Sequence, residues 1–104
     1  DRLEAFRRAF PECRGLSFDT ISGSGPNGAI IHYKPERETA APINSDLLYL
    51  CDSGGRYLDG TTDVTRTLHF GTPSPWQRQC FTRVLKGVIQ LARAIFPRGT
   101  SGLQ

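Results

Sequence analysis

Up to residue 70, the pattern of apolar and polar positions predicts short β-strands joined by loops. Residues 46–52 contain an apolar run bounded by aspartates, and residues 61–70 alternate, with one aspartate and several threonines on the same side. Residues 29–33, AIIHY, are rich in β-favouring side chains, and residues 17–21 form a shorter candidate strand. The glycine-rich segment 23–28, GSGPNG, is predicted to be a loop.

Beyond residue 73 the periodicity changes to that of a helix. Ser74, Pro75 and Gln77 form a capping box with proline at the first helical position, so they predict where the helix begins. Pro97 limits how far the helix extends. Residues 1–10 are predicted to form an amphipathic helix or the end of one. A buried apolar stripe is predicted along the C-terminal helix, made of Phe81, Val84, Leu85, Val88, Ala92 and Ile95.

Composition and charge narrow the classes of protein. Thirteen basic and ten acidic residues give a net charge of +3, and the arginines are spread along the chain. A nucleic-acid interface more often gathers its basic residues on one face, so nucleic acid is not an expected partner. The apolar runs are too short to span a membrane, and residues 1–10 lack the apolar core of a signal peptide. Three cysteines without a CxxC spacing argue against a disulfide framework and favour a reducing compartment such as the cytoplasm.

Asp52 and Asp63 are the main candidates for chemistry, and they lie eleven residues apart across a predicted hairpin. If the hairpin is centred on residues 57–58, the two carboxylates face each other. A turn at Asp59–Gly60 instead leaves them on one face but about 13 Å apart along the strands. A shared metal site then requires a bulge or a wider loop among the glycine-containing residues 54–60.

Two carboxylates held close together repel unless a cation lies between them, and oxygen ligands suit ions such as Mn²⁺. The alternative is that each aspartate caps a turn or pairs with a nearby arginine, and spacing alone favours this alternative. His32 has two interpretations as well. It is either a half-buried structural histidine or a hydrogen-bond donor to a substrate carbonyl or its developing oxyanion. His69 is predicted to be structural or a surface residue, and GSGPNG lacks the Lys-Ser/Thr of a phosphate-binding loop.

Three segments carry a family resemblance: TISGSGPNGAIIHY, then YLCDSGGRYLDGTTDVTRTLHFGTPS, then the helix with VLKG and FPRGT. Together they resemble aminopeptidase P, one of the pita-bread metallopeptidases. The resemblance covers most of the chain, and its most specific part is DSG followed by DGTTDVTRT. It implies an α+β fold in which a curved antiparallel sheet is backed by helices. The chain would supply one half of that fold and leave part of its apolar surface exposed.

The resemblance also implies roles for individual residues. Asp52 matches an aspartate that binds one of two metal ions, Asp63 matches the aspartate that bridges both, and His32 matches a histidine that positions the substrate and stabilises the transition state. The two divalent ions are expected to be manganese, with zinc in some relatives. The implied reaction releases the N-terminal residue from a peptide with proline second, through attack by a metal-bound hydroxide.

The family's other metal ligands, a histidine and two glutamates, are expected outside this chain. Residues 1–104 are therefore expected to be a partial catalytic domain that ends before those ligands, inactive alone and binding metal weakly or not at all. Two alternatives stay open, a prolidase-type dipeptidase and a non-catalytic pita-bread binding module. Expected partners are peptides that begin Xaa-Pro, with no nucleic acid and no membrane, and a homodimer of the parent enzyme fits the resemblance.

Overall fold

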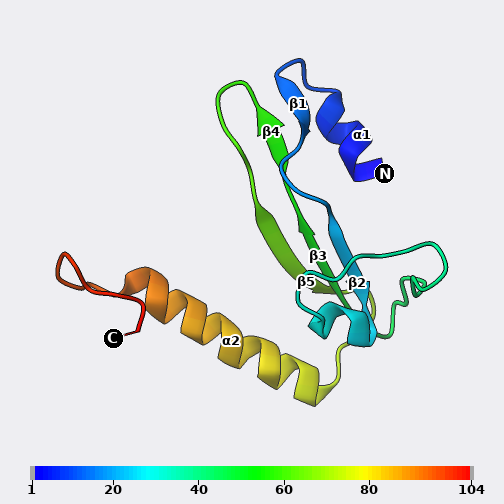
Figure 1. Cartoon of the computed structure of the whole chain (residues 1–104). Coiled ribbons are helices and arrows are strands. Elements are labelled where there is room, and N and C mark those ends of the chain that lie inside the picture. The colour runs from blue at the N-terminus through cyan, green and yellow to red at the C-terminus, as the bar shows by residue number, and fades with distance from the viewer. Residues whose placement is uncertain (1, 104) are drawn as a thin grey trace. The chain divides into compact units, whose positions relative to one another are not determined.

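The computed structural model describes residues 2–103, which fall into two compact units divided between Thr72 and Pro73. The first unit contains the strands and two short helices, α1 (Arg2–Arg8) and the 3₁₀ helix η1 (Gly25–Ala29). The second unit contains one long helix, α2 (Pro75–Arg93). Figure 1 shows the order of these elements along the chain.

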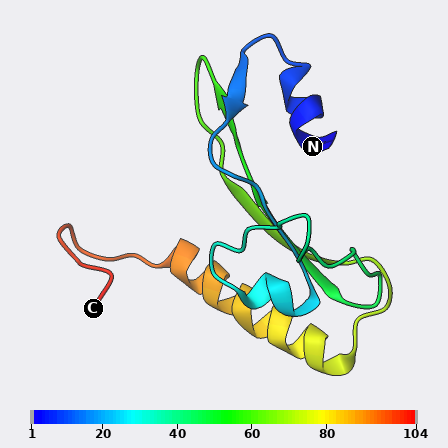
Figure 2. The same ribbon diagram turned by 45° about the vertical axis from the view of Figure 1, so that its right-hand side comes forward.

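Antiparallel pairing organises the first unit. The five strands are β1 (Cys13–Leu16), β2 (Ile21–Ser24), β3 (Leu48–Ser53), β4 (Gly55–Tyr57) and β5 (Val64–His69). One sheet has the order β2-β3-β5 and the other pairs β1 with β4. Only Gly54 separates β3 from β4, so both sheets belong to one long, narrow ribbon, as Figures 1 and 2 show. In this ribbon β3 is the central strand, with a neighbour on each edge.

The hairpin that joins the two candidate aspartates adopts neither predicted register. Asp52 pairs with Thr65, whereas a turn at Asp59–Gly60 would pair it with Thr67. The Tyr57 N–H donates to the Gly60 carbonyl at 2.8 Å, so the turn is centred on Leu58 and Asp59. The bridge between Arg56 and Thr61 keeps this register beyond Gly54. Gly60 thus closes the hairpin as a strand-end partner instead of lying at the tip.

The predicted strand at residues 29–33 is wrong. Successive three-residue hydrogen bonds wind this segment into the end of η1 and a turn: the Ile30 N–H donates to the Asn27 carbonyl at 3.3 Å, and the Tyr33 N–H donates to the Ile30 carbonyl at 3.2 Å. His32 lies in this turn with φ at 56° and is exposed. Pro26 presets the backbone for the start of η1, and this local bonding overrides the β propensity of the side chains.

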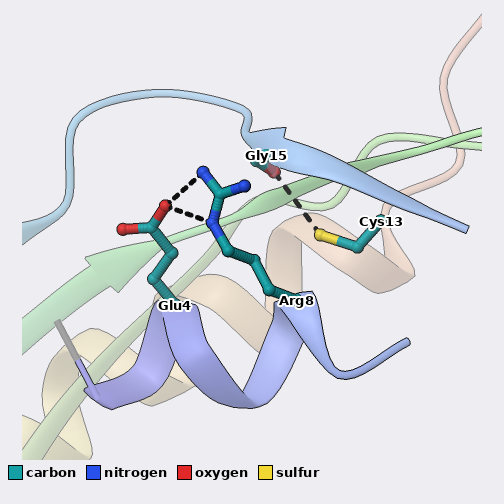
Figure 3. Close-up of polar contacts among 4 residues, drawn as sticks. All are labelled: Glu4, Arg8, Cys13 and Gly15. Atoms are coloured by element: carbon teal, nitrogen blue, oxygen red, sulfur yellow. Dashed lines mark hydrogen bonds and ion pairs between the residues drawn. The ribbon is translucent and has the colours of Figure 1, made fainter. Parts of the chain in front are cut away.

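The N-terminal helix is confirmed as α1, and Figure 3 shows its salt bridge, in which the Arg8 guanidinium lies 2.6 Å from Glu4 one turn earlier. The neighbouring strand β1 was not predicted from the sequence. Gly15 in β1 has φ at 128°, and the ladder with β4 is irregular between Cys13 and Gly15. The candidate strand at residues 17–21 overlaps the structure only at Ile21, where β2 begins.

The capping box of α2 is confirmed. The Ser74 hydroxyl accepts a hydrogen bond from the Gln77 N–H at 3.2 Å, and the Gln77 side chain accepts one from the Ser74 N–H at 2.7 Å. The helix ends at Arg93, before Pro97. The stripe predicted to be buried is exposed instead, with Val84 at 68% and Val88 at 59%. Within residues 73–103 no second helix or strand is present to cover α2.

The described residues contain no buried apolar side chain, and their buried polar side chains are Ser24 and Ser53. Apolar residues are exposed along both α1 and α2, which agrees with the expectation that this piece of a larger fold leaves apolar surface uncovered.

Candidate metal site

Asp52 occupies the middle of the ribbon, because it pairs with Ile21 of β2 on one side and with Thr65 of β5 on the other. The residue is only half-buried, but its Oδ1 atom is fully buried and has no hydrogen-bond partner. A buried carboxylate oxygen without a partner is costly unless a cation or another donor reaches it. This unpaired atom therefore fits a metal ligand better than a carboxylate that caps a turn.

Asp63 lies two residues before Thr65, in the exposed segment that precedes β5. Thr65 shares its face with Asp52, and the Arg56–Thr61 bridge keeps the same register beyond Asp63. Extending the alternation of β5 back by two positions therefore puts Asp63 on this face as well. The two aspartates are thus diagonal neighbours, with Cα atoms about 7–8 Å apart. At this spacing the two aspartates are candidates for one shared ion, and the bulge that a turn at Asp59–Gly60 would require is not needed.

The ladder is interrupted at the level of Asp63. The Ser17 hydroxyl donates to the Thr62 carbonyl at 2.8 Å, and the Ser17 N–H donates to the Gly54 carbonyl at 3.2 Å. The Gly55 N–H donates to the Thr62 hydroxyl at 3.0 Å. A Cβ atom added at Gly54 would overlap both the Thr62 carbonyl oxygen and the Ser17 hydroxyl. The side chains of Ser17 and Thr62 were not singled out from the sequence, where the Gly54–Gly55 pair was the available signal.

His32 lies outside the β3–β5 ladder, in the exposed turn after η1. His69 has a local partner, since its Nδ1 accepts a hydrogen bond from the Gly71 N–H at 3.1 Å, which agrees with a structural assignment. Within residues 2–103 no three or more His, Cys, Asp or Glu side chains gather as a metal would require. Asp52 and Asp63 are therefore a candidate pair of oxygen ligands, and no third such side chain joins them within residues 2–103.

Tyr49, on the same central strand as Asp52, has a hydroxyl whose pKa is shifted by its surroundings. Burial raises the pKa of its hydroxyl, while a 2.8 Å hydrogen bond to Ser22 partly opposes this effect and the neighbouring Cys51 adds to it. The ring lies 5.8 Å from that of Phe70. Cys13, Cys51 and Cys80 are all free thiols, as the sequence predicted.

A family model for metallopeptidase family M24 matches residues 1–104, and the chain belongs to this family. Among curated relatives, it is 64% identical over 102 residues to a probable Xaa-Pro aminopeptidase P from Laccaria bicolor and 59% identical to aminopeptidase P1 from Lotus japonicus. Each alignment covers 98% of this chain but only 16% of the relative. The chain thus spans about one sixth of the length of these enzymes.

Solved structures give the same assignment. The X-prolyl aminopeptidase from Caenorhabditis elegans, described as a cytosolic enzyme with a di-nuclear active site, matches 98% of this chain and 17% of its own with a TM-score of 0.90 and 44% identity. A prolidase from Thermococcus sibiricus matches 82% of this chain and 22% of its own, with a TM-score of 0.72 and 32% identity. The α+β pita-bread fold is therefore confirmed, with this chain as a piece of it. None of the helices in residues 2–103 has the length and apolar character needed to cross a membrane.

Proposed function

We propose that residues 1–104 are part of the catalytic domain of an Xaa-Pro aminopeptidase and that Asp52 and Asp63 are two of its metal ligands. The observation that carries this proposal is the buried, unpartnered Oδ1 of Asp52 on the same face of the ribbon as Asp63. The remaining ligands lie outside this chain. Peptides with proline at the second position are the proposed substrates.

The spacing of the two aspartates supports the assignment. Two solved variants of Escherichia coli aminopeptidase P each carry alanine in place of one aspartate, and the two substituted positions are eleven residues apart in that enzyme. Asp52 and Asp63 have the same separation. The E. coli variants match this chain at 28% and 32% identity, with TM-scores of 0.77 and 0.63.

Two divalent ions, manganese by preference and zinc as an alternative, are proposed for the complete enzyme. When bound, such a pair supplies an activated water and a Lewis acid for hydrolysis of the Xaa-Pro amide. Asp52 would hold its ion from the central strand, where pairing on both sides fixes its backbone. Asp63 would reach the same ion and its neighbour from the diagonal position. No third His, Cys, Asp or Glu joins this pair within residues 2–103, so the isolated chain should not hydrolyse peptides.

His32 is the proposed substrate-binding and catalytic histidine. Its φ of 56° lies in the left-handed region, which a side chain other than glycine occupies at some energetic cost. The turn exposes the imidazole, so it is free to donate a hydrogen bond to the carbonyl oxygen of a bound peptide. That donation would stabilise the negative charge that develops on the oxygen during attack.

A cytoplasmic location and a homodimer complete the proposal. The description of the C. elegans relative as cytosolic supports the location. The free thiols of all three cysteines agree with a reducing compartment. The homodimer rests on the family resemblance, and sedimentation of the full-length enzyme would test it.

Peptide hydrolysis by the full-length enzyme tests the proposed function. After removal of bound metal by a chelator, added Mn²⁺ should restore release of the first residue from an Xaa-Pro tripeptide. The 104-residue chain alone should show no turnover. Cleavage of Xaa-Pro dipeptides but not of tripeptides would favour the prolidase alternative. Absence of both hydrolysis and metal binding would favour the non-catalytic binding module and reject the proposal.

A further inference from the structure

We infer that Ser17 is a positioning residue for Asp63: its hydroxyl reaches across the central strand at Gly54 and fixes the peptide that joins Thr62 to Asp63. The inference rests on the proposed function, because it concerns how the chain presents a proposed metal ligand.

Three backbone segments meet at this level of the ribbon. Ser17 follows β1, Gly54 separates β3 from β4 in the middle, and Thr62 precedes β5 on the far side. The Ser17 N–H donates to the Gly54 carbonyl at 3.2 Å, so the two segments are directly paired. The Ser17 hydroxyl then passes over Gly54 to the Thr62 carbonyl at 2.8 Å. This contact needs glycine at position 54, because a Cβ atom there would occupy the same space.

The Thr62 carbonyl is available to Ser17 because it has left the ladder. In a regular hydrogen-bonded pair of antiparallel strands, two opposite residues exchange both N–H···O bonds. Here the Thr62 N–H still donates to the Gly55 carbonyl at 2.8 Å. The return bond, however, runs from the Gly55 N–H to the Thr62 hydroxyl at 3.0 Å. The threonine side chain thus replaces its own carbonyl in the ladder, and the carbonyl turns toward Ser17.

This rotation bears directly on Asp63. The Thr62 carbonyl and the Asp63 nitrogen belong to one planar peptide group. Fixing the carbonyl direction therefore fixes the direction of the N–Cα bond of Asp63 and so limits where its Cβ atom can lie. The N–H, the carbonyl and the hydroxyl of Thr62 are all engaged by Ser17 or Gly55. Asp63 itself lies outside any strand, so its neighbours supply this constraint.

A purely structural role for Ser17 would predict lower stability with unchanged metal binding. A positioning role instead predicts that loss of the Ser17 hydroxyl lowers metal affinity and kcat and changes the unfolding temperature little. Groups behind metal ligands typically affect metal affinity or activity by about 10–100-fold when they are removed. KM for the peptide should change little, because the role inferred for Ser17 acts on a metal ligand and not on the peptide.

The experiment compares Ser17→Ala with Ser17→Thr and Ser22→Ala in the full-length enzyme, by Mn²⁺ titration calorimetry, kinetics and thermal unfolding. Ser17→Ala should lose about 10-fold or more in Mn²⁺ affinity and in kcat. Ser17→Thr, which retains the hydroxyl, should recover most of both. Ser22→Ala is the matched control, because it removes another hydroxyl bond of the same ribbon, the one to Tyr49, and should keep wild-type Mn²⁺ affinity.

Wild-type Mn²⁺ affinity and kcat in Ser17→Ala would overturn the inference. If Ser17→Ala is too unstable to assay, Thr62→Val removes the hydroxyl that replaces the carbonyl in the ladder and should give the same loss, with an unchanged affinity overturning the inference equally. These outcomes also distinguish failure of the positioning role from failure of the proposed function. A wild-type enzyme without Mn²⁺-dependent Xaa-Pro hydrolysis rejects both, whereas an active enzyme that is indifferent to Ser17 rejects only the positioning role.

Discussion

Thr65 of β5 lies directly opposite Asp52 of β3, and this pairing sets the relation between the two candidate metal ligands. It places Asp63 one alternate position further along the same face. A shift of two residues in either direction would make the aspartates direct partners or move them apart along the strands. The observed register makes the two aspartates diagonal neighbours, which is the arrangement that the proposed shared metal site requires.

Replacing either aspartate by asparagine should abolish tight metal binding in the full-length enzyme. Asp52→Asn and Asp63→Asn keep the size of the side chain but remove the charge that attracts the ion. Each should lower Mn²⁺ affinity by more than the about 10–100-fold expected for groups behind the ligands. Asp59→Asn is the control, since it makes the same change at the exposed tip of the hairpin. Calorimetry that still found two tightly bound ions in Asp63→Asn would contradict the proposed site.

The sequence correctly predicted those strands and helices whose side-chain pattern matches the backbone hydrogen bonding that they adopt. The alternation in residues 61–70 corresponds to β5, and the apolar run in residues 46–52 corresponds to β3. The capping box at Ser74 identified the start of α2, because its hydrogen bonds are made within the first helical turn. In each of these cases the side-chain pattern and the backbone bonds lead to the same structure.

The register of the hairpin between Asp52 and Asp63 and the turn at His32 could not be predicted from local side-chain patterns. An Asp-Gly pair normally marks the centre of a tight turn, yet Gly60 is bonded to Tyr57 as a strand-end partner. The side chains of residues 29–33 have high β propensity, but η1 and the following turn fix their backbone. The part played by Ser17 depends on a contact across 45 positions of sequence, which no local pattern reveals.

Gly54→Ala should destabilise the full-length enzyme, because the new methyl group would overlap the Thr62 carbonyl and the Ser17 hydroxyl. Overpacking of this kind costs about 1–3 kcal/mol, and a backbone atom cannot move aside as easily as a side chain. Gly60→Ala offers a matched control, since a Cβ atom there meets nothing within 4 Å. Urea unfolding should show a clear loss for Gly54→Ala and a stability within about 0.5 kcal/mol of wild type for Gly60→Ala. Equal stabilities would show that the ribbon opens at this point to admit a side chain.

Ser74→Ala should reduce the helicity of a peptide that spans residues 73–96. The change removes the hydroxyl that accepts the Gln77 N–H, and the loss of such an N-cap costs about 1 kcal/mol. Thr82→Ala is the control, because the Thr82 hydroxyl bonds back to the Arg78 carbonyl inside the helix and alanine has the higher helix propensity. Circular dichroism should therefore show less helix for the first peptide and no loss for the second. A Ser74→Ala peptide as helical as wild type would mean that the capping box does not direct where α2 begins.

Tyr49 should make the ribbon less stable in alkaline solution. Burial raises the pKa of its hydroxyl above the ordinary value of 10.0. The unfolded chain then loses this proton at a lower pH than the folded chain does, so stability is retained below about pH 10 and falls as the pH rises through the folded pKa. Urea midpoints of the full-length enzyme and of Tyr49→Phe, compared from about pH 8 to about pH 11, isolate this contribution. The wild-type enzyme should lose stability relative to Tyr49→Phe as the pH rises, and a constant difference would exclude this contribution.

The position of β3 between two partner strands also affects how often the backbone around each candidate ligand opens to solvent. An amide hydrogen within β3 exchanges with solvent only after a ladder separates, so Asp52 belongs to the slowest-exchanging part of this ribbon. Asp63 lies at the interruption beside Gly54, where no ladder protects it. Local opening would therefore release Asp63 before Asp52. Deuterium uptake resolved to single residues would show the two carboxylates on segments with very different opening lifetimes.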